Sequence, residues 1–177
     1  KPIFELMNDI FGMDLSSSDE QGLSDLCKKN RLDVERDATY GQLLDELMKH
    51  IVEPTFSQPI FVTDYPKAIS PLAKGHRNGN LELVERFELF IAGTEFANSF
   101  TELNDPIDQR ERFEMQARLL REGDEEAHPI DEQFLEAMET GMPPTGGVGI
   151  GIDRLVMLMT RQRWIKDVIL FPTLRSV

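Results

Sequence analysis

The sequence of 177 residues contains a single cysteine, Cys27, so no disulfide can form within the chain. A lone cysteine fits a reducing compartment. No uninterrupted apolar run reaches the length of about 20 residues that a membrane-spanning helix needs. The chain begins at Lys1 without a basic segment followed by an apolar one, so we find no secretion signal. We therefore expect a cytoplasmic protein with no membrane contact.

Positive charge is also scarce in this chain. Its 19 lysines and arginines are outnumbered by 32 aspartates and glutamates, which gives a formal net charge of −13. A surface that binds nucleic acid needs clustered lysines and arginines to contact phosphates. The composition therefore excludes a broad nucleic-acid surface in these residues. The longest acidic run, Asp124-Glu125-Glu126, is typical of a solvated loop.

Several motifs that spacing alone would reveal are missing. Cys27 and His50 have no further ligands at the spacing that zinc requires. The glycines near the C-terminus form neither a dinucleotide fingerprint in a βαβ unit nor a P-loop followed by Gly-Lys-Ser/Thr. No Ser-His-Asp arrangement can be argued. We interpret His76, in the polar loop 74–80, as a loop histidine with a structural partner.

Residues 1–53 are predicted to form a helical segment. An apolar stripe from Phe4 to Phe11 stops at Gly12, and a capping cluster at 16–19 precedes a second stripe. A capping box at 39–42 opens a third helix, which Pro54 is expected to end. The leucines and methionines of these stripes are predicted core residues.

Three parts of residues 54–177 are predicted to be extended. Ile60–Thr63 has the composition of a strand. Two stretches at 87–92 and 95–103, with a turn near Gly93, are typical of a hairpin. The glycine-rich residues 146–151 form the last predicted strand.

Two helices are predicted between the hairpin and the last strand. The first runs from an Asp105-Pro106 cap to Gly123, and the second covers about 131–140. The buried positions of the first are predicted to be Phe113, Ala117 and Leu120. Because strands and helices show no regular βαβ alternation, we predict an α+β fold with an antiparallel sheet flanked by helices.

The polar positions of the hairpin are unusually acidic. Glu88 and Glu95 lie on neighbouring strands across the turn, where two carboxylates would repel each other unless a cation such as Mg²⁺ lay between them. Asn98, Phe100 and Glu102 share one strand face by parity. Glu95 has the opposite parity, so it joins them only through a bulge or a position at the turn. On spacing alone, a solvated sheet face is the simpler interpretation.

The segment 146–151 has four glycines in six residues. A strand with so little side-chain bulk lets a flat ligand lie against the backbone. The next helix is predicted to start at Asp153, with Arg154 in its first turn, where a guanidinium can hold a phosphate. Tight helix–sheet packing and a structural ion pair explain the same residues equally well.

The glycine-rich segment 147–155, Gly-Val-Gly-Ile-Gly-Ile-Asp-Arg-Leu, resembles motif 3 of class II aminoacyl-tRNA synthetases. The hairpin residues 86–91 and 95–106 resemble the lysine-specific branch of that class, as do 70–77 and 167–172. The resemblance implies that residues 54–177 are the C-terminal part of the class II catalytic core.

The resemblance also implies roles for single residues at the nucleotide end. Glu88 and Glu95 match acids that hold Mg²⁺ bridging the phosphates of ATP. Arg154 matches the motif 3 arginine that contacts the γ-phosphate.

For the amino-acid end, the resemblance implies a pocket for L-lysine. Glu102 matches the acid that pairs with the ε-ammonium, and Asn98 and Phe100 match other pocket residues. Gly149 and Gly151 match its floor.

Motif 1, which builds the dimer interface of this class, and motif 2, whose arginine binds the α-phosphate, do not occur in these residues, and neither does an anticodon-binding barrel. The resemblance thus implies a fragment of a homodimeric ligase that activates lysine with ATP and transfers it to tRNA(Lys), with the isolated fragment inactive. Two alternatives stay open: a related ligase that modifies a protein lysine, and a non-catalytic ligand-binding module. An aspartate-specific relative is disfavoured because Glu102 would repel a second carboxylate.

Overall fold

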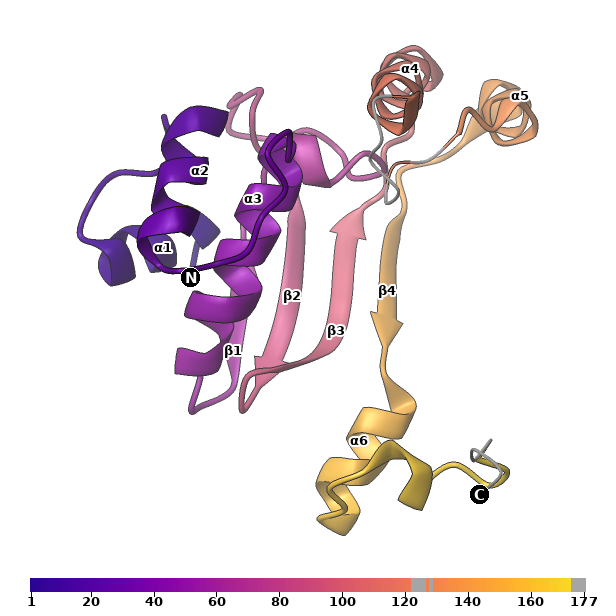
Figure 1. Ribbon diagram of the computed structural model, residues 1–177. Helices are drawn as coiled ribbons and strands as arrows, with labels where there is room; N and C mark the ends of the chain where they lie inside the picture. Colours follow the sequence, from indigo (N-terminus) through magenta and orange to yellow (C-terminus); the bar gives the residue numbers. More distant parts are fainter. Residues whose placement is uncertain (122–126, 128, 173–177) are drawn as a thin grey trace.

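A four-stranded sheet forms the centre of the molecule, with helices over one face and at both ends (Figure 1). The computed structural model describes residues 1–121, 127 and 129–172. The predicted helix end at Gly123 and the acidic run at 124–126 lie outside these residues. Among the residues described, no helix is both long enough and apolar enough to cross a membrane.

The described strands form one antiparallel sheet in chain order. They are β1 (Ile60–Thr63), β2 (Arg86–Ile91), β3 (Thr94–Thr101) and β4 (Gly146–Ile150). Ala92 and Gly93 connect β2 to β3 with φ values of 51° and 72°. Positive φ at both central residues is what a type I′ hairpin turn requires. The predicted α+β class with an antiparallel sheet is confirmed.

Three short helices form a layer over β1 and β2 (Figure 1). They are α1 (Ile3–Phe11), α2 (Glu20–Lys29) and α3 (Tyr40–Leu47). Gly12 follows α1 with a left-handed φ of 67°, as a helix C-terminus favours. The Asp19 side chain caps α2 by accepting from the N–H of Gly22. Thr39 and Gln42 form the predicted reciprocal capping box of α3.

The helical path does not end at Pro54 as predicted. After α3 the chain continues through a π-helical turn, η1 (Met48–Val52), and a 3₁₀ turn, η2 (Glu53–Thr55). The first turn of a helix leaves its N–H groups unpaired, so a proline without an N–H fits inside that turn. The carbonyl of Glu53 comes within 3.2 Å of the place where a Cβ on Gly93 would lie, so the helical layer closely meets the β2–β3 turn.

The helical layer and the sheet share one hydrophobic core. Helices α1, α2 and α3 each bury three side chains. They pack against the strand residues Val62 and Phe90, which are 0% and 2% exposed. Phe56 and Phe90 meet edge to face with ring centroids 5.4 Å apart. Predicted core leucines that are buried here include Leu6, Leu23, Leu26, Leu43, Leu44 and Leu47.

Three further helices lie at the two ends of the sheet. Helices α4 (Pro106–Arg121) and α5 (Glu132–Gly141) lie at one end, and α6 (Ile152–Thr160) lies beyond the opposite end, after β4 (Figure 1). Asp131 caps α5 by accepting from the N–H of Phe134 at 2.9 Å. Every residue of α6 is described, and none is buried.

Helix α4 is attached by its first half and not along the whole predicted stripe. Phe113 is buried as predicted, but Ala117 is half-buried and Leu120 is exposed, so those two predictions are wrong. Arg112 explains the difference, because its nearly buried guanidinium donates to backbone carbonyls of the segment 70–73. Hydrogen bonds from this arginine therefore attach the helix where a continuous apolar contact was predicted.

Candidate functional site

A bulge in the β2–β3 hairpin brings its polar residues to one face of the sheet. Phe90 pairs with Glu95, whereas Glu88 pairs with Asn98, because β3 contains one extra residue, Phe96, between these pairs. Directly opposite residues share a face, and so do residues two apart on one strand. Glu88, Glu95 and Asn98 therefore lie on the same face. Of the two arrangements that would bring Glu95 to this face, a bulge or a position at the turn, the structure has the bulge.

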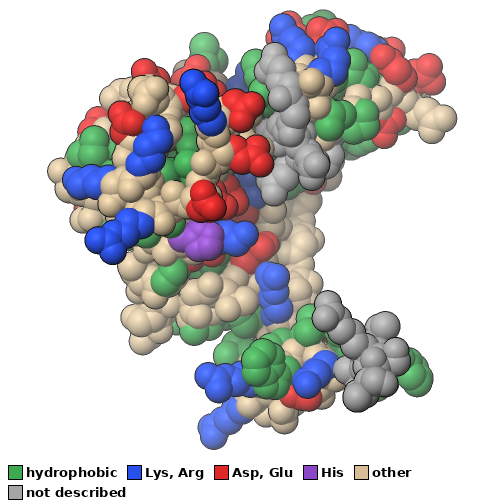
Figure 2. Space-filling view, in the orientation of Figure 1, with side chains coloured by type: hydrophobic (Ala, Val, Ile, Leu, Met, Phe, Trp, Pro, Cys, Tyr) green, Lys and Arg blue, Asp and Glu red, His purple; other side chains and the backbone are tan. Residues whose placement is uncertain are grey.

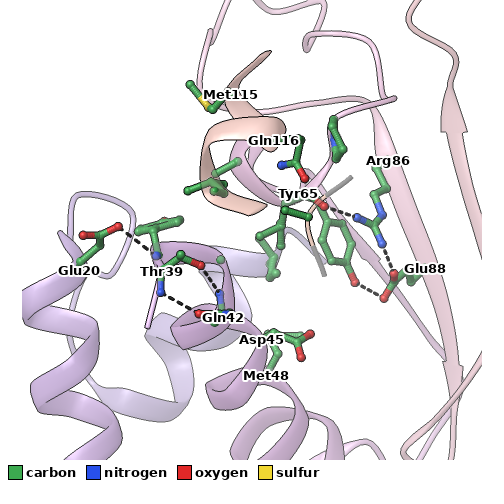
Figure 3. Close-up of a pocket in the computed structure, with 18 of the residues that line it drawn as sticks. Glu20, Thr39, Gln42, Asp45, Met48, Tyr65, Arg86, Glu88, Met115 and Gln116 are labelled. Atoms are coloured by element: carbon green, nitrogen blue, oxygen red, sulfur yellow. Dashed lines mark hydrogen bonds and ion pairs between the residues drawn. The ribbon is translucent and has the colours of Figure 1, made fainter. Parts of the chain in front are cut away.

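The carboxylate of Glu88 is held by two side chains (Figure 3). Arg86 Nη2 donates to Oε1 at 2.5 Å, and the hydroxyl of Tyr65 donates to Oε2 at 2.7 Å. Burial and the neighbouring Glu88 carboxylate raise the pKa of Tyr65, so the phenol stays protonated and remains a donor. A carboxylate offers about four lone-pair positions, so Glu88 keeps acceptor capacity for a further ligand.

Asn98, Phe100 and Glu102 follow one another along this face of β3 and just beyond its end. Asn98 Oδ1 accepts from Arg86 Nε at 3.2 Å, and Phe100 packs against the hydrophobic core. Burial raises the pKa of Glu102. None of the ion pairs formed by the described residues includes Glu102. A cationic group on a ligand would stabilise this carboxylate in its charged form.

Strand β4 places a nearly bare backbone beside these side chains. Gly149 pairs with Asn98, and Gly147 pairs with Phe100. A Cβ on Gly147 would overlap the carboxylate of Glu102, so this glycine leaves the space in which that side chain lies. Gly149 has looser surroundings, because the nearest atom is 3.8 Å from its Cβ position. The two glycines make a flat floor next to the acid.

Arg154 meets Glu95 where β4 passes into α6. Gly151 is the N-cap residue of α6, and its N–H donates to the carbonyl of Phe96 at 2.9 Å. Arg154 Nη1 donates to the backbone carbonyl of Glu95 at 2.6 Å and lies 3.5 Å from its carboxylate. The two side chains are 46% and 40% exposed, so this ion pair is open to water and to ligands. The structure thus brings the predicted phosphate-binding cation to a predicted metal-binding acid.

A cavity of about 400 Å³ borders the site between the helical layer, β2 and α4 (Figure 3). Residues on its wall include Asp45, Met48, Glu53, Tyr65, Arg86, Glu88, Met115 and Gln116. The cavity shares Glu88 with the predicted site but none of the glycines of β4, and Arg86 beside Glu88 also lies on its wall. Burial, followed by the nearby carboxylate of Glu88, raises the pKa of Glu53 to about 6. Burial and the nearby Glu88 therefore favour the protonated form of Glu53 where the cavity meets the hairpin.

Glu88 and Glu95 are the acids that the predicted divalent cation would use. Within residues 1–121, 127 and 129–172, no group of three or more histidine, cysteine, aspartate or glutamate residues has a metal-binding arrangement. Magnesium prefers oxygen ligands and is usually held by one or two carboxylates together with phosphates and waters. These two acids therefore fit Mg²⁺ that is shared with a polyphosphate, and not a site built by the protein alone.

Two contributors to the site were not predicted from the sequence, Arg86 and Tyr65. Arg86 lies two positions before Glu88 on the same strand face, and that spacing is a signal that could have found it. Tyr65 comes from the turn after β1, and no local pattern links it to the hairpin. The predicted structural partner of His76 is confirmed, because its Nε2 lies 3.1 Å from Oδ1 of Asp64.

Comparisons with known proteins agree with the resemblance. Residues 7–175 match the family described as class II tRNA synthetases (D, K and N). Proteins named lysine–tRNA ligase are 51% identical over 175 residues in Porphyromonas gingivalis, 62% over 143 in Thermosynechococcus vestitus and 53% over 150 in Enterococcus faecalis. The matches cover 98%, 81% and 85% of this chain, but 30%, 28% and 30% of those relatives. The chain therefore spans less than a third of the length of these relatives.

Proposed function

Because the chain belongs to the class II tRNA synthetase family, we propose that it forms part of the catalytic domain of a lysine–tRNA ligase. The proposal is carried by Glu102, a partly buried carboxylate without an ion-pair partner among the described residues, beside a bare glycine backbone. It lies on the sheet face that also holds Glu88 and Glu95. In this proposal residues 1–53 are a connecting segment, and residues 54–177 are the C-terminal part of the catalytic core.

The lysine side chain points its ε-ammonium at Glu102 in this proposal. Pairing with a cation favours the ionised carboxylate and so opposes the effect of burial, which raises the pKa of this group. Asn98 and Phe100 line the pocket, and Gly149 and Gly151 lie along its floor. A substrate with a carboxylate in place of the ammonium would be repelled.

ATP lies at the other end of the same face. Glu88 and Glu95 would hold Mg²⁺ together with ATP, and Arg154 would contact the γ-phosphate. Bound magnesium supplies neutralisation of phosphate charge. The lysine carboxylate attacks the α-phosphorus, a new oxygen–phosphorus bond forms, and the bond to the departing pyrophosphate breaks. The protein contributes orientation and charge stabilisation without a covalent intermediate.

The second step of the proposed reaction transfers lysine to tRNA(Lys). A 3′-terminal hydroxyl attacks the carbonyl carbon of lysyl-adenylate, and AMP leaves. Because these residues carry a net charge of −13, most contacts to tRNA phosphates lie in other parts of the intact enzyme. We also propose that the intact enzyme is a cytoplasmic homodimer.

An uncovered apolar surface supports the view that the chain works as part of a longer protein. On the outer face of the sheet, Val148 and Ile150 are 63% and 56% exposed, and Met159 of α6 is 77% exposed. Figure 2 shows hydrophobic side chains on the surface of the α6 lobe. Contiguous exposed apolar surface marks an interface. We propose that other residues of the intact ligase cover it, and that the isolated chain has negligible adenylation activity.

The test is lysine-dependent exchange of pyrophosphate into ATP. We compare the 177-residue chain with a chimera, in which this chain replaces the matching segment of the Porphyromonas gingivalis lysine–tRNA ligase. We expect exchange by the chimera near that of its parent and none by the chain alone. Exchange by the isolated chain at the parental rate would contradict the proposal that it is an incomplete site.

Glu102→Gln in the chimera tests the lysine pocket. Loss of one partner of a desolvated charge pair costs about 3 kcal/mol, so kcat/KM for lysine should fall about 100-fold. Glu114→Gln, on the exposed side of α4, is the matched control and should leave exchange unchanged. An unchanged kcat/KM in Glu102→Gln would remove the proposed role. Transfer of labelled lysine to tRNA(Lys), and not to a protein lysine, separates this function from the related protein-modifying ligase.

A further inference from the structure

Arg86 contacts one residue at each end of the proposed site, Glu88 at the nucleotide end and Asn98 at the lysine end. Figure 3 shows its contact with Glu88. Its side chain is 17% exposed. Nη2 donates to Glu88 Oε1 at 2.5 Å, and Nε donates to Asn98 Oδ1 at 3.2 Å. Nη1 donates to the carbonyl of Ile69 and to the hydroxyl of Ser70, both at 2.9 Å. All three guanidinium nitrogens are therefore engaged.

Tyr65 fixes the plane of this guanidinium. The Arg86 Cζ atom lies 4.6 Å from the centroid of the Tyr65 ring, within the range of a cation–π contact. The hydroxyl of the same tyrosine donates to the second oxygen of Glu88 at 2.7 Å. A planar guanidinium that is stacked on a ring and bonded along its edges has one preferred orientation. Arg86, Tyr65 and Glu88 thus form one rigid group on β2 and the turn before it.

We infer that Arg86 is a positioning residue that couples the lysine pocket to the magnesium–nucleotide end of the site. The inference rests on the proposed function, in which Asn98 lines the lysine pocket and Glu88 holds the metal. One guanidinium sets the positions of both side chains, so a shift of either changes the hydrogen bond available to the other. Arg86 acts through these neighbours.

Arg112 is the control for Arg86, because it also anchors the fold but, within the described residues, contacts neither the lysine pocket nor the nucleotide end of the proposed site. Its side chain is more buried, at 6% exposed, and it donates to the carbonyls of Ser70 and Ala73 and to the carboxylate of Asp108. Both arginines therefore anchor the segment 70–73 to the sheet or to α4. Of these two arginines, only Arg86 is hydrogen-bonded to side chains of the proposed site, Glu88 and Asn98.

The experiment uses the chimera with Arg86→Lys, Arg86→Gln and the control Arg112→Lys. The side chain of Arg86→Lys keeps the charge but cannot form hydrogen bonds along two edges of a plane. We therefore expect this variant to have a higher KM for the substrate lysine and for Mg²⁺–ATP. Each KM should rise about fivefold to tenfold, which is the usual range of coupling between two sites. Arg86→Gln should raise both further, with kcat changing less than either KM. Arg112→Lys should lower the melting temperature and leave both KM values unchanged.

A double variant tests the coupling itself. If Arg86 acts through Asn98, then adding Asn98→Ala to Arg86→Lys should raise KM for lysine by less than the product of the two single effects. Independent effects that multiply would overturn the inference. So would an Arg86→Lys enzyme that loses thermal stability like Arg112→Lys but keeps both KM values.

A measurement without catalysis distinguishes failure of this inference from failure of the proposed function. In the ¹⁵N-labelled 177-residue chain, Asn98→Ala and Glu88→Gln should each shift the NMR signal of the Arg86 Nε–H, while the Arg112 signal stays in place. No shift, together with an active chimera, would contradict the inference alone. A wild-type chimera without lysine-dependent exchange would contradict the proposed function.

Discussion

Helices α3 and α6 have similar lengths, of 8 and 9 residues, but opposite surroundings. Helix α3 buries Leu43, Leu44 and Leu47 in the core, whereas α6 buries none of its apolar side chains. Both sequences carry apolar residues at helical spacing, and both form helices. The pattern therefore determines the helix and its apolar side, while burial depends on whether another surface lies opposite. In α6 that surface is not supplied by the described residues.

The proposed site also lies partly on a well-packed region and partly on a poorly covered one. Glu88 and Asn98 belong to a hairpin that packs on the helical layer. The glycine floor and Arg154 belong to β4 and α6, which are joined to the rest through the β3 edge and the contact of Arg154 with Glu95. The acids are thus held by the core, while the arginine sits on an arm with few packing contacts.

The largest expected difference between the packed region and the arm is in the effect of two leucine substitutions on stability. Leu44 of α3 is fully buried, so Leu44→Ala should lower the free energy of unfolding of the chain by about 2–5 kcal/mol. Leu158 of α6 is 45% exposed, so Leu158→Ala should change it by less than about 0.5 kcal/mol. Urea denaturation followed by circular dichroism measures both.

In the chimera we expect Leu158→Ala of the arm to destabilise the protein, unlike in the isolated chain. If other residues of an intact ligase cover α6, Leu158→Ala there should cost about 2 kcal/mol, as a buried leucine does. A cost as small as in the isolated chain would mean that α6 stays exposed in the longer protein. If Leu44→Ala and Leu158→Ala lowered the free energy of unfolding of the isolated chain equally, α6 would be packed as well as α3.

Local signals were sufficient for most of the packed region. Gly12, the Asp19 cap and the Thr39–Gln42 capping box each act within one helical turn, so the sequence alone predicted where these helices begin or end. The strand Ile60–Thr63 was predicted with its observed bounds. The resemblance supplied the site residues, and strand parity showed that Glu95 could join them only through a bulge or a position at the turn.

Features that depend on distant residues could not be predicted. The bulge depends on how two strands pair, and from the sequence a position of Glu95 at the turn was an equally open alternative. The exposure of Leu120 follows from the attachment of α4 through Arg112, an interaction between segments about 40 residues apart. The contact of Arg86 with Asn98 likewise requires the shifted register. In each case the missing information was a long-range pairing.

Gly147→Ala tests whether β4 of the arm determines the position of the Glu102 carboxylate. The new methyl group would overlap the end of the Glu102 side chain, which can rotate away, so the fold should survive while the carboxylate moves. In the chimera, KM for lysine should rise about tenfold, which corresponds to about 1.4 kcal/mol. Gly146→Ala is the control, because nothing lies within 4 Å of its Cβ position. An equal KM for the two variants would show that Gly147 is not needed to place Glu102.

Glu53 gives the smallest expected effect and concerns the packed region alone. Burial and, after it, the carboxylates of Glu88, Asp45 and Glu95 together raise its pKa from 4.5 to about 6, and Lys49 opposes them. The folded chain thus binds this proton more tightly than the unfolded chain. The contribution of Glu53 to stability is therefore present at pH below 4.5 and is lost as the pH rises through about 6.

Glu53→Gln should remove this pH dependence. Because the side chain is only partly buried, solvent screening limits the change to about 1 kcal/mol between pH 4.5 and pH 7. Urea denaturation of wild type and variant at both pH values measures the difference, with the exposed Glu114→Gln as control. Since Glu53 faces the hairpin and the helical layer, the difference should be the same in the isolated chain and in the chimera. A value that changes between them would mean that the covering residues reach the packed region as well as the arm.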